Sequence, residues 1–177
     1  MSDSISIVIP TLDGDPWTLD SVPAGVETAV VQEGNRSEAR NEGARRTSGD
    51  VLVFCDDDVS FDESFLWKQV EATETGTILG LEDFDFGLLL TRFMIVHRVD
   101  FEELGGFDER LNHMEDTEFC LNALSRGKTL NELPRCAVHH EEHESPGQGR
   151  WATLRNSAYL AARYPQYGPW LLRELLL

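Results

Sequence analysis

Three consecutive carboxylic acids, Asp56-Asp57-Asp58, come directly after an apolar run at positions 51–55 (VLVFC). Carboxylates crowded at the end of a buried strand repel one another, and a hard divalent cation relieves that repulsion. Open α/β sheets bind ligands at the carboxyl ends of their strands, which is where this acidic triplet falls. The triplet therefore predicts a metal-assisted site for an anionic substrate. An acidic surface turn is the competing interpretation.

A second acidic pair, Glu115-Asp116, stands at the start of a predicted helix over 115–125. The helix dipole and the free N–H groups of the first turn favour a carboxylate there as the anion. A carboxylate held in this way can accept a proton as a general base. It can also simply cap the helix, and the two roles are compatible.

Two histidines, His139 and His140, stand at the end of a predicted strand over 136–139, and imidazole is a good ligand for Mn²⁺. Because side chains alternate along a strand, only one of the two can face the site, and we favour His140. Arg40 offers a planar guanidinium that suits phosphate oxygens. Pairing with a nearby glutamate on the surface is an equal alternative for Arg40.

The elements that must position these residues follow from hydrophobic spacing. Strands are predicted over 5–9, 26–31, 51–55, 77–81, 88–97 and 129–133, and helices over 38–46, 62–75, 99–104, 115–125 and 151–162. Ser37 is the predicted cap of the first helix. Strands and helices alternate early and mix later, which predicts an α/β domain with a mainly parallel central sheet flanked by helices.

Composition limits the remaining choices. A chain of 177 residues suits one domain. Its formal net charge of −17 argues against nucleic-acid binding, because an acidic surface repels phosphate. Such a charge is also typical of halophilic proteins. The three cysteines form no CxxC pair and predict reduced core thiols in a cytoplasmic protein. The start does not look like a signal peptide, and no apolar run reaches the roughly 20 residues of a membrane span. The leucine-rich tail at 170–177 could lie on the inner face of a membrane or pack on its own domain.

Five segments occur together in a fixed order: 7–11 (IVIPT), 39–43 (ARNEG), the acidic triplet, 105–109 (GGFDE) and Glu115-Asp116. With these segments the chain resembles the family-2 glycosyltransferases of the GT-A fold over roughly residues 4–143. The resemblance implies a single GT-A-like domain over 1–177, with a mixed acceptor-side half and C-terminal helices in 151–177. It also implies a metal-dependent inverting enzyme that moves a sugar from a nucleotide-diphosphate donor to a glycan, a lipid-linked sugar or a small molecule.

The resemblance also assigns roles to the donor side of the site. Asp58 would hold Mn²⁺ or Mg²⁺ together with His140 or His139. Asp56 would share the metal or contact the ribose. Asp57 would lie beside them in the cofactor site or face solvent.

On the acceptor side, the resemblance makes Asp116 the general base, while Glu115 would position the acceptor. Arg40 would meet the nucleotide or its diphosphate. Asn41 and Gly43 are expected to shape the turn and the packing of the helix.

The first half departs from the family pattern, because only about thirty residues separate Pro10 from Arg40. That length predicts a shortened nucleotide-binding half, with one strand–helix unit missing or reduced to a loop. Segment 30–34 (VVQEG) would then be the second strand, with Glu33 in the position that recognises the base, or the third strand, with no such residue. Two alternative functions follow: a non-catalytic GT-A-like domain that binds a sugar or a protein, and a metal-dependent hydrolase or nucleotidyltransferase.

Overall fold

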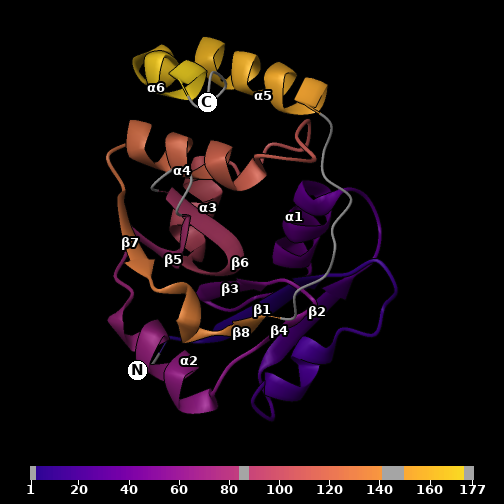
Figure 1. Ribbon diagram of the computed structural model, residues 1–177. Coiled ribbons are helices and arrows are strands. Elements are labelled where there is room, and N and C mark those ends of the chain that lie inside the picture. Colours follow the sequence, from indigo (N-terminus) through magenta and orange to yellow (C-terminus); the bar gives the residue numbers. More distant parts are fainter. Residues whose placement is uncertain (1–2, 84–87, 141–149, 174–177) are drawn as a thin grey trace.

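The computed structural model describes residues 3–83, 88–140 and 150–173 (Figure 1). Its strands are β1 (Ile5–Pro10), β2 (Glu27–Val31), β3 (Val51–Cys55), β4 (Val59–Ser60), β5 (Thr77–Asp83), β6 (Leu88–His97), β7 (Thr129–Leu133) and β8 (His139–His140). Its α-helices are α1 (Arg36–Arg46), α2 (Glu63–Ala72), α3 (Arg98–Leu104), α4 (Glu115–Ser125), α5 (Arg150–Arg163) and α6 (Gly168–Arg173). Three 3₁₀ turns complete the described elements: η1 (Trp17–Ser21), η2 (Arg135–Ala137) and η3 (Pro165–Tyr167).

A six-stranded sheet in the order β2-β1-β3-β6-β5-β7 forms the centre of the molecule. β1 pairs in parallel with β2 and β3, and β5 pairs in parallel with β7. Only β6 runs against its neighbours, between β3 and β5. The central sheet is therefore mostly parallel, as the sequence predicts. A separate two-residue ladder joins β4 to β8 beside the end of β3.

The alternation of side chains along β1 divides the core between the two faces of the sheet. Ile5, Ile7 and Ile9 face the side covered by α2, and Val8 faces the side covered by α1, α3 and α4. Both faces are covered, which explains why β3 is apolar at every position instead of alternating.

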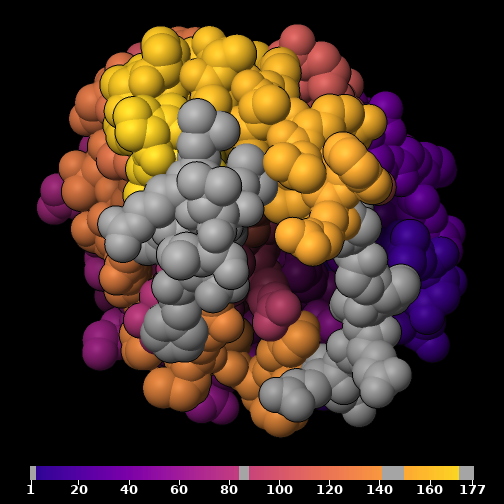
Figure 2. Space-filling view, turned by 45° about the horizontal axis from the view of Figure 1, so that its top comes forward, coloured from indigo at the N-terminus to yellow at the C-terminus, as the bar shows by residue number. Residues whose placement is uncertain are grey.

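The C-terminal helices α5 and α6 form an outer layer on α4, and Figure 2 shows them as a continuous yellow-orange cap on one face of the molecule. Tyr164 donates a hydrogen bond to the buried Glu118 of α4 at 2.5 Å. Tyr159 donates to Asp108 at 2.6 Å. Trp170 and Leu171 of α6 pack against the main core, so the described part of the leucine-rich tail lies on its own domain. Residues 174–177 lie outside the described residues.

Three local predictions are wrong. Asn35, not Ser37, caps α1: its side chain accepts the N–H of Glu38, whose carboxylate accepts the N–H of Asn35 in return. The segment predicted as a strand over 136–139 is the turn η2 followed by the short β8, because Pro134 starts a 3₁₀ turn. Cys136 is exposed, whereas Cys55 and Cys120 are buried.

Among the described residues, no helix has the length and apolar character needed to cross a membrane.

Candidate active site

The acidic triplet forms a turn directly after β3, and a buried threonine from a distant segment holds it. Thr18 of η1 donates its hydroxyl hydrogen to the carbonyl oxygen of Asp56 at 2.8 Å and accepts the N–H of Val59 at 3.0 Å. The Thr18 N–H also points to the carbonyl oxygen of Asp57 at 3.4 Å. These bonds hold the backbone of the turn, and with it the positions from which the three Asp side chains start.

Asp58 and His140 face each other across the β4–β8 ladder. Nε2 of His140 lies 3.2 Å from Oδ2 of Asp58, and both side chains are about four-fifths buried. Burial raises the pKa of Asp58; the charge of His140 lowers it, and Asp56 and Asp57 raise it further. His139 is exposed and lies edge-on to Trp17, with the ring centroids 6.1 Å apart. Of His139 and His140, only His140 therefore lies beside the acidic triplet.

Arg40 bridges the two acidic groups of the site. Its side chain is 1% exposed and contacts Oδ1 of Asp56 at 2.7 Å through Nη2. Through Nη1 it contacts Oε1 of the buried Glu115 at 3.1 Å. The guanidinium also lies 5.6 Å from the centre of the Phe107 ring. The sequence left Arg40 between a phosphate contact and a surface ion pair. The structure shows a buried double ion pair, so the ion pair is not on the surface, and the phosphate contact stays a prediction.

The pair Glu115-Asp116 opens α4 after a strained residue. Met114 has φ +64°, in the left-handed region, and its side chain is buried. Such a conformation in a residue other than glycine costs roughly 1–3 kcal/mol and is often found beside functional groups. The turn directs Asp116 into the first turn of the helix, where its Oδ1 accepts the N–H of Thr117 at 2.8 Å.

The surroundings of Asp116 change its acidity. Burial raises the pKa of Asp116 to about 7, and the adjacent charge of Glu115 adds to the rise. The N–H of Thr117 and the charge of Arg40 act in the opposite direction, and Asp83 raises the pKa. A carboxyl group with a pKa near 7 can accept a proton at neutral pH and still be a useful base.

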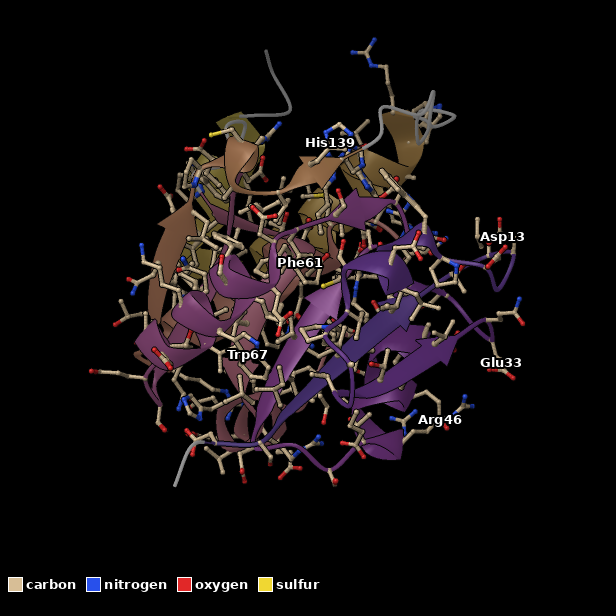
Figure 3. All side chains as sticks on the ribbon, turned by 90° about the horizontal axis from the view of Figure 1, so that it is seen from below. Asp13, Glu33, Arg46, Phe61, Trp67 and His139 are labelled. Atoms are coloured by element: carbon tan, nitrogen blue, oxygen red, sulfur yellow. The ribbon has the colours of Figure 1, made fainter. Side chains whose placement is uncertain are left out.

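A cavity of about 460 Å³ lies against the acidic triplet. Its lining comes from the end of β1, the β2–α1 connection, the triplet and the loop before α4: Pro10, Thr11, Leu12, Gln32, Gly34, Asn35, Arg36, Ala39, Asp56, Asp57, Asp58 and Asn112. Glu33 is not in this lining. Glu33 points outward at the edge of the molecule, where its Oε2 lies 3.5 Å from Nη2 of Arg46 (Figure 3).

The ARNEG and GGFDE segments meet at the back of the site. Nδ2 of Asn41 donates to the carbonyl oxygen of Phe107 at 2.9 Å, and Oδ1 of Asn41 accepts the Phe107 N–H at 2.9 Å. A side chain at Gly43 would come within 2.3 Å of Val8. The expected packing roles of Asn41 and Gly43 are confirmed, since both hold α1 in place against its neighbours.

The sequence analysis missed three residues of the site. They are Thr18, which bonds to Asp56, Asn112, which lines the cavity, and Arg92, which contacts His140. Thr18 lies between the predicted strands 5–9 and 26–31, where the sequence predicts no helix or strand, and no pattern distinguishes it from other threonines. Arg92 occurs inside an apolar strand, and a cation in the run LLLTRFMIV is a signal that could have been used.

A family model described as Glycosyl transferase family 2 matches residues 28–100, which include α1, the acidic triplet and β6. No curated protein matches the chain.

Several solved structures are similar over most of the chain, at low sequence identity. The mannosyltransferase PcManGT from Pyrobaculum calidifontis, in complex with GDP-Man and Mn²⁺, has a TM-score of 0.67 at 15% identity, over 99% of this chain and 70% of that one. TarS from S. aureus, in complex with UDP-GlcNAc, has a TM-score of 0.66 at 14% identity, over 97% and 72%. A mutant β1,4-galactosyltransferase 7 from Drosophila, in complex with manganese, UDP-Gal and xylobiose, has a TM-score of 0.63 at 15% identity, over 82% and 75%.

The chain has the GT-A glycosyltransferase fold. The fold and the family match together support a glycosyltransferase as the enzyme class. In this GT-A domain the acidic triplet lies within the matched segment, and Glu115-Asp116 lies beyond it.

Proposed function

We propose that this GT-A domain is a metal-dependent inverting glycosyltransferase that uses a nucleoside-diphosphate sugar. The observation that carries the proposal is the buried Arg40, which ties Asp56 of the triplet to Glu115 beside Asp116. A donor-binding group and a candidate base are thereby fixed relative to each other, as a displacement between two bound substrates requires.

The residues beside the triplet fit a divalent cation. Asp58 supplies a carboxylate oxygen and His140 an imidazole nitrogen, 3.2 Å apart, and this ligand pair suits Mn²⁺. Within residues 3–83, 88–140 and 150–173, no group of three or more such side chains is arranged to hold a metal ion. Asp58 and His140 would hold the ion, and oxygens of the substrate would complete its ligands. When bound there, a divalent ion stabilises the charge of the departing diphosphate. Two of the similar structures contain Mn²⁺ or manganese with a nucleotide sugar, which supports this assignment.

In this proposal Asp116 takes the proton of the acceptor hydroxyl. The freed oxygen forms a bond to the anomeric carbon while the bond from that carbon to the diphosphate breaks, and the nucleoside diphosphate leaves with the bonding electrons. A single displacement of this kind inverts the anomeric carbon. Arg40 acts as a positioning residue, because it holds Glu115 and thereby the first turn of α4.

The donor half is compact. Between β1 and α1 the described structure has one 3₁₀ turn and one strand, β2, which supports the proposal of a shortened nucleotide-binding half. Glu33 lies away from the cavity, so we do not assign base recognition to it in this conformation. The proposed acceptor is a glycan, a lipid-linked sugar or a small molecule. We also propose that the enzyme works in the cytoplasm at high salt, because salt screens the repulsion within a chain of net charge −17.

The test is calorimetric titration with UDP, GDP and their sugars, with and without Mn²⁺, at high salt. We expect metal-dependent binding that Asp58→Ala abolishes. Asp62→Ala is the matched control, since Asp62 is exposed and its side chain makes no capping bond. Absence of nucleotide binding by the wild-type chain would refute the proposal in favour of a binding domain. Release of free sugar without an acceptor would instead indicate a hydrolase.

A further inference from the structure

Arg92 lies beside the acidic triplet, on the antiparallel strand β6. Its carbonyl oxygen accepts the N–H of Asp56 at 3.1 Å, so the side chain of Arg92 starts next to the first acid of the triplet. The residue is half-buried. Its guanidinium Nη1 lies 3.4 Å from Nδ1 of His140.

Among the described residues, the Arg92 guanidinium forms no ion pair with a carboxylate, and its side-chain hydrogen-bond contact is with the ring of His140. This is unexpected in a protein with 32 acidic residues and 15 lysines and arginines. By contrast, Arg40 forms ion pairs with two carboxylates, those of Asp56 and Glu115. A half-buried guanidinium favours an anion with oxygens arranged to accept its N–H groups.

The arrangement indicates where such an anion would lie. His140 separates Asp58 from Arg92: Nε2 faces Asp58 at 3.2 Å and Nδ1 faces Arg92 at 3.4 Å. A cation held by Asp58 and His140 would therefore have Arg92 on the other edge of the same imidazole. A ligand that touches both positions needs two separate acceptor oxygens, one for the cation and one for the guanidinium, and a diphosphate supplies both with negative charge.

We infer that Arg92 binds the terminal phosphate of the donor diphosphate, the group that leaves when the sugar is transferred. The inference rests on the proposed function and names the residue that recognises the leaving group. Arg40, for which the sequence predicts a diphosphate contact, forms ion pairs with Asp56 and Glu115, whereas Arg92 forms none among the described residues.

The experiment compares UDP and GDP with UMP and GMP in the presence of Mn²⁺, using wild type, Arg92→Gln, Arg92→Lys and the charge-matched control Lys68→Gln. Lys68 is exposed on α2. We expect Arg92→Gln to weaken binding of the diphosphates by roughly ten- to a hundred-fold, the effect of losing a hydrogen bond to a charged group. Binding of the monophosphates should stay at the wild-type level, and Lys68→Gln should bind all four ligands normally.

A separate titration of Mn²⁺ alone, followed by electron paramagnetic resonance, should be unchanged by Arg92→Gln. If Mn²⁺ binding falls, or if mono- and diphosphates weaken equally, Arg92 positions His140 and the inference is overturned. Should Arg92→Gln fail to fold, Arg92→Lys is the test: it keeps the charge but loses the paired N–H donors, so a smaller loss confined to the diphosphates is expected. Nucleotide binding by the wild type that Arg92→Gln leaves intact refutes this inference alone. No binding by the wild type refutes the proposed function itself.

Discussion

Replacing Asp116 by asparagine should change how the stability of the fold depends on pH. Burial and the charge of Glu115 raise the pKa of Asp116 from 3.8 to about 7 in the folded chain. Between about pH 4 and pH 7 the folded state therefore holds a proton that the unfolded state has lost. The free energy of unfolding falls as pH rises through this window and is flat above it, because both states are then ionised.

The magnitude follows from the size of the rise. Each pKa unit corresponds to about 1.4 kcal/mol, so the full effect is about 4 kcal/mol, and solvent at the partly open site reduces it. Asparagine has no proton to lose. Asp116→Asn should therefore be more stable than the wild type at pH 8, by about 1–4 kcal/mol, and the difference should shrink towards pH 4.

Urea denaturation at half-unit pH steps, at constant high salt, measures this directly. The matched control is Asp62→Asn, an exposed acid at the start of α2 whose curve should run parallel to the wild type. Transfer activity should fall by roughly two or more orders of magnitude in Asp116→Asn, the scale of a lost general base. Parallel stability curves for Asp116→Asn and wild type would show that Asp116 ionises normally and would remove the reason for calling it a base.

Three further changes test the architecture around this site. Arg40→Met should destabilise the fold by about 3–5 kcal/mol in urea, since it leaves Asp56 and Glu115 facing each other without their cation; a loss under 1 kcal/mol would contradict the buried bridge. His140→Ala should weaken Mn²⁺ binding measured by calorimetry, whereas His139→Ala, which alters an exposed ring, should leave it unchanged. Asn35→Ala should cost about 1 kcal/mol in thermal or urea unfolding through loss of the α1 capping box, and a neutral result would mean that the cap contributes nothing.

The sequence predicts the central elements well, because their signals are local. The run at 51–55 is apolar throughout and forms the buried β3, and the helix predicted over 115–125 has the observed bounds of α4. The predicted mostly parallel sheet is confirmed by the strand order and pairing. These features depend on spacing within a few residues, which a single sequence displays.

The connections across the site could not be predicted, because they join residues far apart in the chain. Nothing near Arg40 indicates that Glu115 will be its partner, and nothing near Thr18 indicates that it will hold the turn at Asp56. The misplaced strand over 136–139 has the same origin: β8 is two residues long and exists only because β4 is there to pair with it.

The β4–β8 ladder has a consequence for the order in which the chain folds. Asp58 is delivered by the first half of the chain and His140 by a strand near the end of the described second segment, so the pair closes a very long loop. Contacts of such sequence separation form late, after the local elements and the sheet have already restricted the chain. The proposed cation site would thus be absent from any state in which only the first half has folded. Mn²⁺ affinity would then report the completed native topology, and adding the ion would favour that last closing step over earlier compact states.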